Sequence, residues 1–362
     1  TNVYCPAGAS YSTPVTEGYY SGPLESSTVN RYEQHVCEAG YYCVSGVRWN
    51  CGSKALYCPQ QSTHPLVVDE GFYSAPLTVP VTNRKEQVIC SPGHYCTAGS
   101  MYNCTAGNYG STTGLTTGEC SGKCNQGYYC MEGSTTPTQQ KCGGIEWYCP
   151  KGSAHPIRVT KSYYTAPLTV DEDLRYEQRI CDAGYYCKNG TRIECGGRKY
   201  YCPEGSVERR EVPKGYVSGP EEISEMTRWE INYCPAGFYC VNGGKNECGV
   251  NKYCPEGSSS PKDVPEGYIA GPEVAIETQK SLIMNCTEGY YCSGGAMMDC
   301  GVGFYCPAGS SDPIPVSDGY FVIPEGVNEM HGVSQSICPA GFYCVNGGKN
   351  ECGVNKYCPE GS

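Results

Sequence analysis

Cysteines recur along the chain with a fixed spacing, and this spacing constrains the fold more than any other feature. A group spaced C-x5-C-x7-C-x6-C begins at Cys37, and groups beginning at Cys181, Cys234, Cys286 and Cys338 repeat it with a last gap of five or six residues. The last cysteine of each group lies 32 positions before the first cysteine of the next. A fixed period of 52 or 53 residues predicts a linear array of modules.

One stretch departs from the period. The group that begins at Cys90 has a third gap of 15 residues, from Cys104 to Cys120, and the next group starts at Cys124 after only three residues. We interpret this stretch as a compact module without a long linker. The expected domains are a truncated module with its linker at 1–36, a module at 37–89, the compact module at 90–123, modules at 124–180, 181–233, 234–285 and 286–337, and a truncated module core at 338–362.

Two further features of the cysteine groups need an explanation. The count of 29 cysteines is odd, which we explain by Cys5 closing a module that begins before Thr1. The segments Cys234–Ser258 and Cys338–Ser362 agree at all 25 positions, two periods apart. Two alternatives account for this identity: a recent duplication of two modules, or an error in assigning the sequence.

The composition argues against a core of aliphatic side chains. Leu, Ile, Val and Phe make up roughly 15% of the chain, below the ~20% of chains that fold by burial alone. Cysteines at this density indicate a disulfide scaffold, and disulfides persist in extracellular or secretory compartments. The net charge of −11 is spread thinly, which disfavours nucleic acid and anionic membranes as partners. No apolar run of ~20 residues is present, so we expect no membrane segment.

Local motifs predict the structure of a module. Each core reads C-x-x-G-[YFH]-Y-C, as at 37–43, and closes with Y-C-P-x-G-S, as at 253–258, while the linkers carry motifs such as G-Y-Y-S-G-P at 18–23. Tyr, Thr and Val in alternation favour short strands, and Gly and Pro separate them. We therefore expect a small disulfide-rich, mostly β and irregular fold, in which two short antiparallel hairpins per module are stapled by two disulfides. An extended Pro-containing linker should pack back on its neighbour, and the modules should form an elongated rod with a ladder of half-buried tyrosines.

Four cysteines in a module allow three pairings, and sequence alone does not choose among them. We prefer the interlaced arrangement, first to third and second to fourth. The expected disulfides are Cys37–Cys51, Cys43–Cys58, Cys181–Cys195, Cys187–Cys202, Cys234–Cys248, Cys240–Cys254, Cys286–Cys300, Cys292–Cys306, Cys338–Cys352 and Cys344–Cys358.

Residues 104–144 read CTAGNYGSTTGLTTGECSGKCNQGYYCMEGSTTPTQQKCGG, with the order G-x-Y-G-S-T-x-G-L-T-T…C-S-G-x-C…G-Y-Y-C…G-S-T-x-P-T. This stretch resembles the cysteine-rich repeats called ephrin-receptor-like, which also occur in long secreted or surface proteins of protists and algae. The other modules resemble them more loosely, through the cysteine spacing and the G-Y-Y-C and Y-C-P-x-G-S motifs. The resemblance implies extracellular stalks, adhesins or flagellar hairs (mastigonemes). The long linker departs from the tighter receptor pattern, so ligand binding is not carried over.

The sequence contains no motif for catalysis. It has no G-x-S-x-G, no phosphate-binding loop and no H-E-x-x-H, so we expect neither an enzyme nor a metal site nor a cofactor. Three N-glycosylation sequons begin at Asn103, Asn189 and Asn285. We expect N-linked glycans at these residues, and linker prolines such as Pro76 and Pro167 are candidates for hydroxylation and O-linked glycans.

Two hypotheses about function follow. The first is a structural subunit of an extracellular glycosylated filament, flagellar hair or surface coat, whose partners are copies of itself or other filament subunits. The alternative is the ectodomain of a cell-surface receptor or adhesin that binds a protein or glycan, with the compact group at 90–149 as the place to look. Both place the chain outside the cell.

Overall fold

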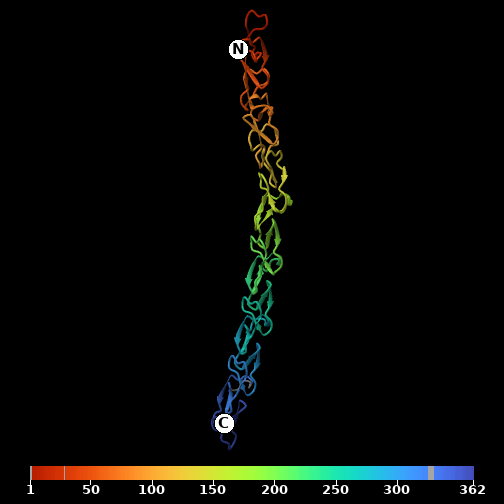
Figure 1. Cartoon of the computed structure of the whole chain (residues 1–362). Helices are drawn as coiled ribbons and strands as arrows, with labels where there is room; N and C mark the ends of the chain where they lie inside the picture. Colours follow the sequence, from red (N-terminus) through yellow and green to blue (C-terminus); the bar gives the residue numbers. More distant parts are fainter. Residues whose placement is uncertain (1, 28, 325–329) are drawn as a thin grey trace. The chain divides into compact units, whose positions relative to one another are not determined.

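The computed structural model describes residues 2–27, 29–324 and 330–362. Residues 1 and 28 of the expected truncated module at 1–36, and residues 325–329 of the expected module at 286–337, lie outside the described residues. The chain divides into two compact units, residues 1–180 with 189–191, and residues 181–188 with 192–362. Within each unit, antiparallel two-stranded hairpins succeed one another in chain order (Figure 1). The fold is a disulfide-rich repeat array, as the cysteine period predicts.

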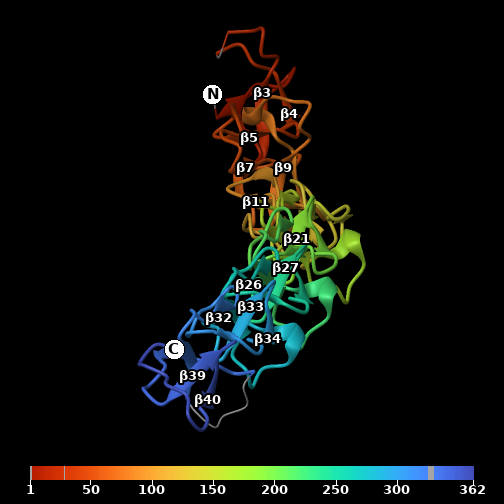
Figure 2. The same ribbon diagram turned by 90° about the horizontal axis from the view of Figure 1, so that it is seen from below.

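A regular module contains three hairpins rather than the expected two, because the linker forms a hairpin of its own. A linker hairpin precedes the first cysteine, a core hairpin carries the second cysteine, and a closing hairpin surrounds the fourth. In the first unit, Figure 2 labels β5, β7, β9 and β11, which belong in turn to a core, a closing, a linker and again a core hairpin.

The linker hairpins are β3 (Tyr19–Gly22) with β4 (Glu33–Val36), β9 (Phe72–Ala75) with β10 (Glu86–Ile89), β19 (Tyr163–Ala166) with β20 (Glu177–Ile180), β25 (Tyr216–Gly219) with β26 (Glu230–Tyr233), β31 (Tyr268–Gly271) with β32 (Leu282–Asn285), and β37 (Tyr320–Ile323) with β38 (Ser334–Ile337). The core hairpins are β5 (Tyr41–Val44) with β6 (Val47–Asn50), β11 (His94–Thr97) with β12 (Ser100–Asn103), β21 (Tyr185–Lys188) with β22 (Thr191–Glu194), β27 (Phe238–Val241) with β28 (Gly244–Glu247), β33 (Tyr290–Ser293) with β34 (Ala296–Asp299), and β39 (Phe342–Val345) with β40 (Gly348–Glu351). The closing hairpins are β1 (Val3–Tyr4) with β2 (Thr13–Pro14), β7 (Leu56–Tyr57) with β8 (Leu66–Val67), β17 (Trp147–Tyr148) with β18 (Ile157–Arg158), β23 (Tyr200–Tyr201) with β24 (Arg210–Glu211), β29 (Lys252–Tyr253) with β30 (Lys262–Asp263), and β35 (Phe304–Tyr305) with β36 (Ile314–Pro315).

The core hairpins turn through two residues with positive φ. In β5–β6 these are Ser45 at 49° and Gly46 at 71°, and in β27–β28 they are Asn242 at 53° and Gly243 at 69°. Two successive positive φ angles define the type I′ turn, whose twist matches that of the flanking strands. Glycine at the second position makes this conformation available without strain.

The linkers differ from the expectation of an extended segment. The first strand of each linker pairs with its own second strand, as in the register Tyr19–Val36 to Gly22–Glu33. Single-turn 3-10 helices lie in four of the loops that join these strands: η1 (Val81–Asn83), η2 (Glu172–Leu174), η3 (Glu225–Thr227) and η4 (Glu277–Gln279). The second linker strand therefore pairs within the linker. The residues just before it contact the preceding core, as the expected packing on a neighbour requires: Cys58 N donates to Arg84 O at 3.0 Å.

The disulfides correct the interlaced pairing. Each core joins its first cysteine to its second and its third to its fourth, as in Cys37–Cys43 and Cys51–Cys58, whose Cα atoms are 5.8 Å apart in both bonds. The same pattern holds from Cys90 to Cys358. The expected pairs that the structure contradicts are Cys37–Cys51, Cys43–Cys58, Cys181–Cys195, Cys187–Cys202, Cys234–Cys248, Cys240–Cys254, Cys286–Cys300, Cys292–Cys306, Cys338–Cys352 and Cys344–Cys358.

Local chain reversal explains the pairing. Gly40, at φ 96°, turns the segment between Cys37 and Cys43 back on itself and brings these two cysteines together. In the core hairpin Cys43 lies opposite Arg48, three residues before Cys51. At about 3.3 Å per residue, this places Cys51 roughly 10 Å along the strand from Cys43. Each disulfide therefore closes its own tight turn at a different level of the core.

The first disulfide of a module packs against one large side chain from the linker hairpin. Val217 packs with Cys234 and Cys240 and the half-buried Phe238. Tyr20, Ile269 and Phe321 occupy the corresponding place in three other modules. Burial of this residue attaches each linker hairpin to the core that follows it, which compensates for the low aliphatic content.

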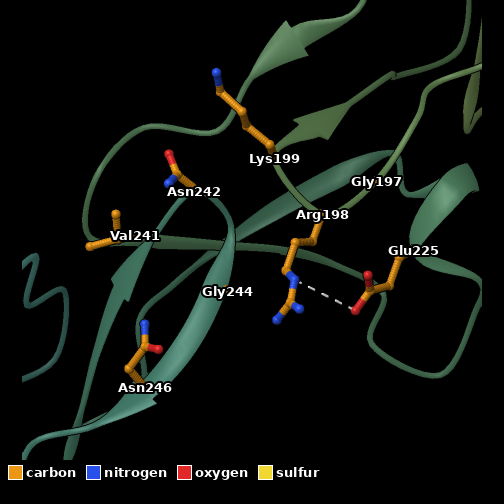
Figure 3. Close-up of a pocket in the computed structure, with 8 residues that line it drawn as sticks. All are labelled: Gly197, Arg198, Lys199, Glu225, Val241, Asn242, Gly244 and Asn246. Carbon is orange, nitrogen blue, oxygen red and sulfur yellow. Dashed lines mark ion pairs between the residues drawn. The ribbon is translucent and has the colours of Figure 1, made fainter.

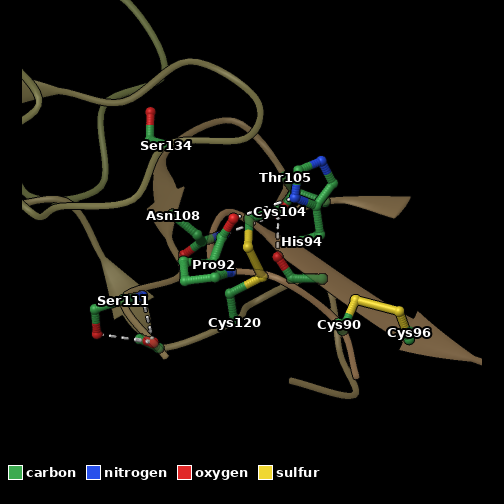
Figure 4. Close-up of a disulfide and its surroundings, with 12 residues drawn as sticks. Cys90, Pro92, His94, Cys96, Cys104, Thr105, Asn108, Ser111, Cys120 and Ser134 are labelled. Atoms are coloured by element: carbon green, nitrogen blue, oxygen red, sulfur yellow. Dashed lines mark hydrogen bonds between the residues drawn. A yellow bond between two sulfur atoms is a disulfide. The ribbon is translucent and has the colours of Figure 1, made fainter. Parts of the chain in front are cut away.

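In the compact module a short hairpin replaces the long linker. Strand β13 (Asn108–Tyr109) pairs with β14 (Gly122–Lys123) directly before Cys124, and β15 (Tyr128–Tyr129) then pairs with β16 (Gln140–Lys141). The disulfide Cys104–Cys120 closes the lengthened gap, with β13 inside the closed loop and β14 after it. Figure 4 shows this disulfide together with Cys90–Cys96.

Candidate functional site: the joints between modules

The contacts between consecutive cores repeat along the chain, and we call each set of contacts a joint. A joint comprises the turn between the third and fourth cysteines of one core, the first strand of the next linker hairpin, and the turn of the following core hairpin. We name it after the third residue of that linker strand. The described joints are those of Ser21, Ser74, Thr165, Ser218, Ala270 and Val322.

At the Ser74 joint one side chain connects two cores. The Ser74 amide donates to Gly99 O of the following core at 3.1 Å, and its hydroxyl donates to Lys54 O of the preceding core at 2.7 Å. Ser74 is 2% exposed. Because water has little access to Ser74, removing its hydroxyl would leave Lys54 O without this hydrogen-bond donor and with no water in its place.

The same joint requires glycine on the side of the following core. A Cβ atom added at Gly99, whose φ is 70°, would lie 1.9 Å from Lys54 O. The Thr165 and Ser218 joints repeat this close approach, at 1.9 Å for Gly190 against Ile145 O and 1.8 Å for Gly243 against Arg198 O. The hydroxyls of Thr165 and Ser218 donate to these same two carbonyls, each at 2.8 Å.

A buried arginine completes these joints. Arg228, on the returning side of the linker, donates from Nη1 to Ser218 O at 2.7 Å and to Ser218 Oγ at 3.2 Å. Arg175 donates to Thr165 Oγ1 at 3.0 Å, and Arg84 donates to the carbonyl of Pro76. The three arginines are 7–8% exposed, and the Nε of each is buried without a hydrogen-bond partner in the described structure. Each guanidinium is thus held by neutral acceptors, which fixes the linker loop around it.

The last two joints lack these groups. Ala270 and Val322 replace the serine or threonine, and Lys280 and Gly332 replace the arginine. The cores that precede them, Cys248–Cys254 and Cys300–Cys306, have a last gap of five residues instead of six. At the Ala270 joint, a Cβ on Gly295 would lie 3.0 Å from Asn251 Cβ and 3.1 Å from its carbonyl oxygen. In the shorter turn, the Asn251 carbonyl therefore lies farther from the glycine of the next core than the Lys54 carbonyl does at the Ser74 joint.

A second set of contacts covers the glycine of the C-x-x-G-[YFH]-Y-C motif. A Cβ on Gly40 would lie 2.5 Å from Asn83 O, and one on Gly237 would lie 2.4 Å from Gln279 O. Next to this contact the Gln279 side-chain amide donates to Glu247 Oε1 at 3.1 Å. Hydrogen bonds from the side chains of Gln279 and Thr278 hold the pKa of Glu247 below its ordinary value. The motif glycine is thus required by the docking of the next linker.

In the first complete module, charged groups reinforce the contact between linker and core. Tyr20 donates its hydroxyl to Glu38 Oε1 at 2.8 Å, and Arg48 Nη1 lies 3.2 Å from the same oxygen and over the Tyr41 ring at 4.4 Å. Burial and the adjacent carboxylate raise the pKa of Tyr20. Burial pushes the pKa of Glu38 upward, but the hydrogen bonds from Tyr20 and Arg48 hold it below its ordinary value.

The expected glycosylation residues lie on the surface. Asn103 ends β12, Asn285 ends β32, and Asn189 occupies the turn of the β21–β22 hairpin, and all three side chains are exposed. They lie in three different hairpins, so the structure does not bring them together. The Ser/Thr, Gly and Arg residues of the joints were not predicted from the sequence, although their recurrence at equivalent positions could have revealed them.

The described residues contain no group of three or more His, Cys, Asp or Glu side chains placed to hold a metal ion. No helix among them is long and apolar enough to cross a membrane. Fourteen disulfides fit a secreted or extracellular protein. Comparison with protein-family models and with curated protein sequences finds no match.

Proposed function

We propose that this chain is a structural subunit of an extracellular filament, flagellar hair or surface coat, built from the modules as repeating units. The observation that carries the proposal is the recurrence of one joint chemistry. The Ser74, Thr165 and Ser218 joints use the same hydroxyl-to-carbonyl bond. A protein that must hold consecutive modules in a fixed relation benefits from such repetition, because each module contacts mainly its neighbours.

The proposed partners are copies of the chain or other subunits of the same assembly. Exposed large apolar side chains precede the first cysteine in several modules, including Ile89, Ile180, Tyr233 and Ile337, each between 41% and 61% exposed. Side chains of this kind at equivalent positions are suited to lateral contacts. N-linked glycans at Asn103, Asn189 and Asn285 would cover other areas of the surface, and the exposure of all three side chains supports their modification.

Electron microscopy of the native material tests the proposal. We expect labelled antibodies against the chain to decorate fibres or a surface lattice. Finding the protein only as single, monodisperse molecules would refute it. A full-length sequence with a membrane helix followed by a cytoplasmic domain would instead favour a receptor or adhesin ectodomain.

A further inference from the structure

Two consecutive joints of the second unit differ in how they neutralise a pair of glutamates. At the Ser218 joint Arg198 Nε lies 3.7 Å from Glu225 Oε1, and Lys245 Nζ lies 3.3 Å from Glu221 Oε2. Figure 3 shows the first of these ion pairs, and both of its side chains line a cavity whose volume is about 530 Å³. The chain therefore supplies a cation for each acidic side chain of this joint.

The Ala270 joint keeps the acids and loses the cations. One period of 52 residues further on, Glu273 and Glu277 take the places of Glu221 and Glu225. Val250 replaces Arg198 and Met297 replaces Lys245 at the same offset. Neither Glu273 nor Glu277 forms an ion pair with any residue that the structure describes.

A cavity occupies this joint. It measures about 320 Å³, with walls that include Val250, Ile269, Ala270 and Met297, and with Glu273 and Glu277 among its lining residues. That volume lies in the range of about 300–1,000 Å³ found for ligand sites.

One cation of the chain also lines this cavity. The ammonium group of Lys280 donates to Pro272 O at 2.9 Å and to Glu273 O at 3.2 Å, so two backbone carbonyls hold it against the linker. One ammonium against two carboxylates leaves a net negative charge beside an apolar wall.

We propose that this cavity binds a lysine or arginine side chain of a partner protein. The aliphatic stem would lie against Val250, Ile269 and Met297, and the charged head would lie between Glu273 and Glu277. Long basic side chains combine an apolar stem with a charged end in this way. The ion pairs of the Ser218 joint show that the equivalent carboxylates accept both a guanidinium and an ammonium. The inference goes beyond the proposed function, because it holds whether or not the array assembles.

Methyl NMR of the full chain tests the proposal directly. The chain has seven methionines, and ¹³C labelling of their methyl groups places a probe on Met297, assigned by its loss in Met297→Leu. We expect the amide of lysine acetylated at its α-amino group, which keeps the side-chain ammonium, to shift the Met297 signal up to a saturating value as its concentration rises. Acetyl-norleucine-amide, which has the same stem without the charge, should bind about tenfold more weakly or not at all. Equal binding of the two probes would mean an apolar cavity without charge recognition and would overturn the proposal.

Matched variants locate the interaction. Changing Glu273→Gln together with Glu277→Gln should weaken the lysine probe about tenfold, whereas Glu221→Gln with Glu225→Gln in the preceding joint should leave it unchanged. Val250→Arg restores the cation that Arg198 supplies in the preceding joint, and it should block the shift of the Met297 signal. Binding that persists in the Glu273/Glu277 variant refutes the proposal. Butylamine binding as tightly as the lysine probe would assign the cavity to free amines and overturn the protein partner.

Discussion

The Gly99 position offers the sharpest test of the joint as described. Replacing Gly99 by alanine adds a methyl group where φ is 70° and where Lys54 O would be 1.9 Å away. The backbone must then move, because the neighbouring atom is a carbonyl oxygen rather than the end of a flexible side chain. The shift separates Lys54 O from the Ser74 hydroxyl, now 2.7 Å away.

The expected cost has two components. An L-residue in the left-handed region costs about 1–2 kcal/mol. Loss of the buried hydrogen bond between Ser74 and Lys54 adds about 1 kcal/mol. A total of about 2–3 kcal/mol corresponds to roughly 30- to 150-fold more frequent opening of the joint.

Amide hydrogen exchange at Ser74, whose N–H donates to Gly99 O at 3.1 Å, measures this opening. The matched control is Gly347→Ala, read at Val322, whose N–H donates to Gly347 O at 2.9 Å. Gly347 has a φ of 79°, but a Cβ there meets the Val322 side chain first, at 2.8 Å, and no hydroxyl bond is at stake. Exchange should therefore rise more in Gly99→Ala than in the control. Equal increases would show that backbone strain alone acts and would refute the joint as described.

Three further predictions concern other groups. Ser218→Ala removes the hydroxyl that donates to Arg198 O and should destabilise the joint by about 1 kcal/mol. Hydrogen exchange of the residue 218 amide should become faster, and an unchanged exchange rate would contradict the assigned hydrogen bond. Because the folded pKa of Glu38 lies below its ordinary value of 4.5, the stability it contributes is present above that pH and is lost as the pH falls through the folded pKa. Denaturant titrations should give a lower free energy of unfolding at pH 3 than at pH 7, and Glu38→Gln should reduce this difference. An identical pH dependence in the variant would argue against a stabilising role of the Glu38 carboxylate. N-glycosidase treatment should lower the mass of the native protein, and Asn189→Gln expressed in the same host should lack one glycan; equal masses would exclude Asn189 as a glycan site.

The sequence was sufficient for the class of fold but not for its disulfide connectivity. The 52-residue period, the short hairpins and the disulfide scaffold follow from cysteine spacing and from Gly and Pro placement. The pairing does not follow, because it depends on the local reversal at Gly40 and on the level of Cys51 along its strand. The motif glycine between Cys37 and Cys43 was the available signal for a tight turn that closes on itself.

The joints could also have been predicted in part. A gap of five rather than six residues before the last cysteine coincides with Ala270 and Val322 in place of serine or threonine. This correlation lies in the sequence, but its meaning needs the contact between Lys54 O and Gly99, which come from different modules. Strand pairing inside the linkers was missed because the first linker strand and the polar stretch before the cysteine each resemble an isolated extended segment.

The pairing of neighbouring cysteines determines how the chain would respond to a pulling force. No disulfide among the described residues connects one core to the next, so between Cys58 and Cys90 the tension passes through 31 residues of uninterrupted backbone. Drawn out at about 3.4 Å per residue, such a linker would span on the order of 100 Å end to end, while the cross-linked loops on either side stay shut. A string of these modules would therefore lengthen stepwise, one unzipped linker at a time, and shorten again when the load is released.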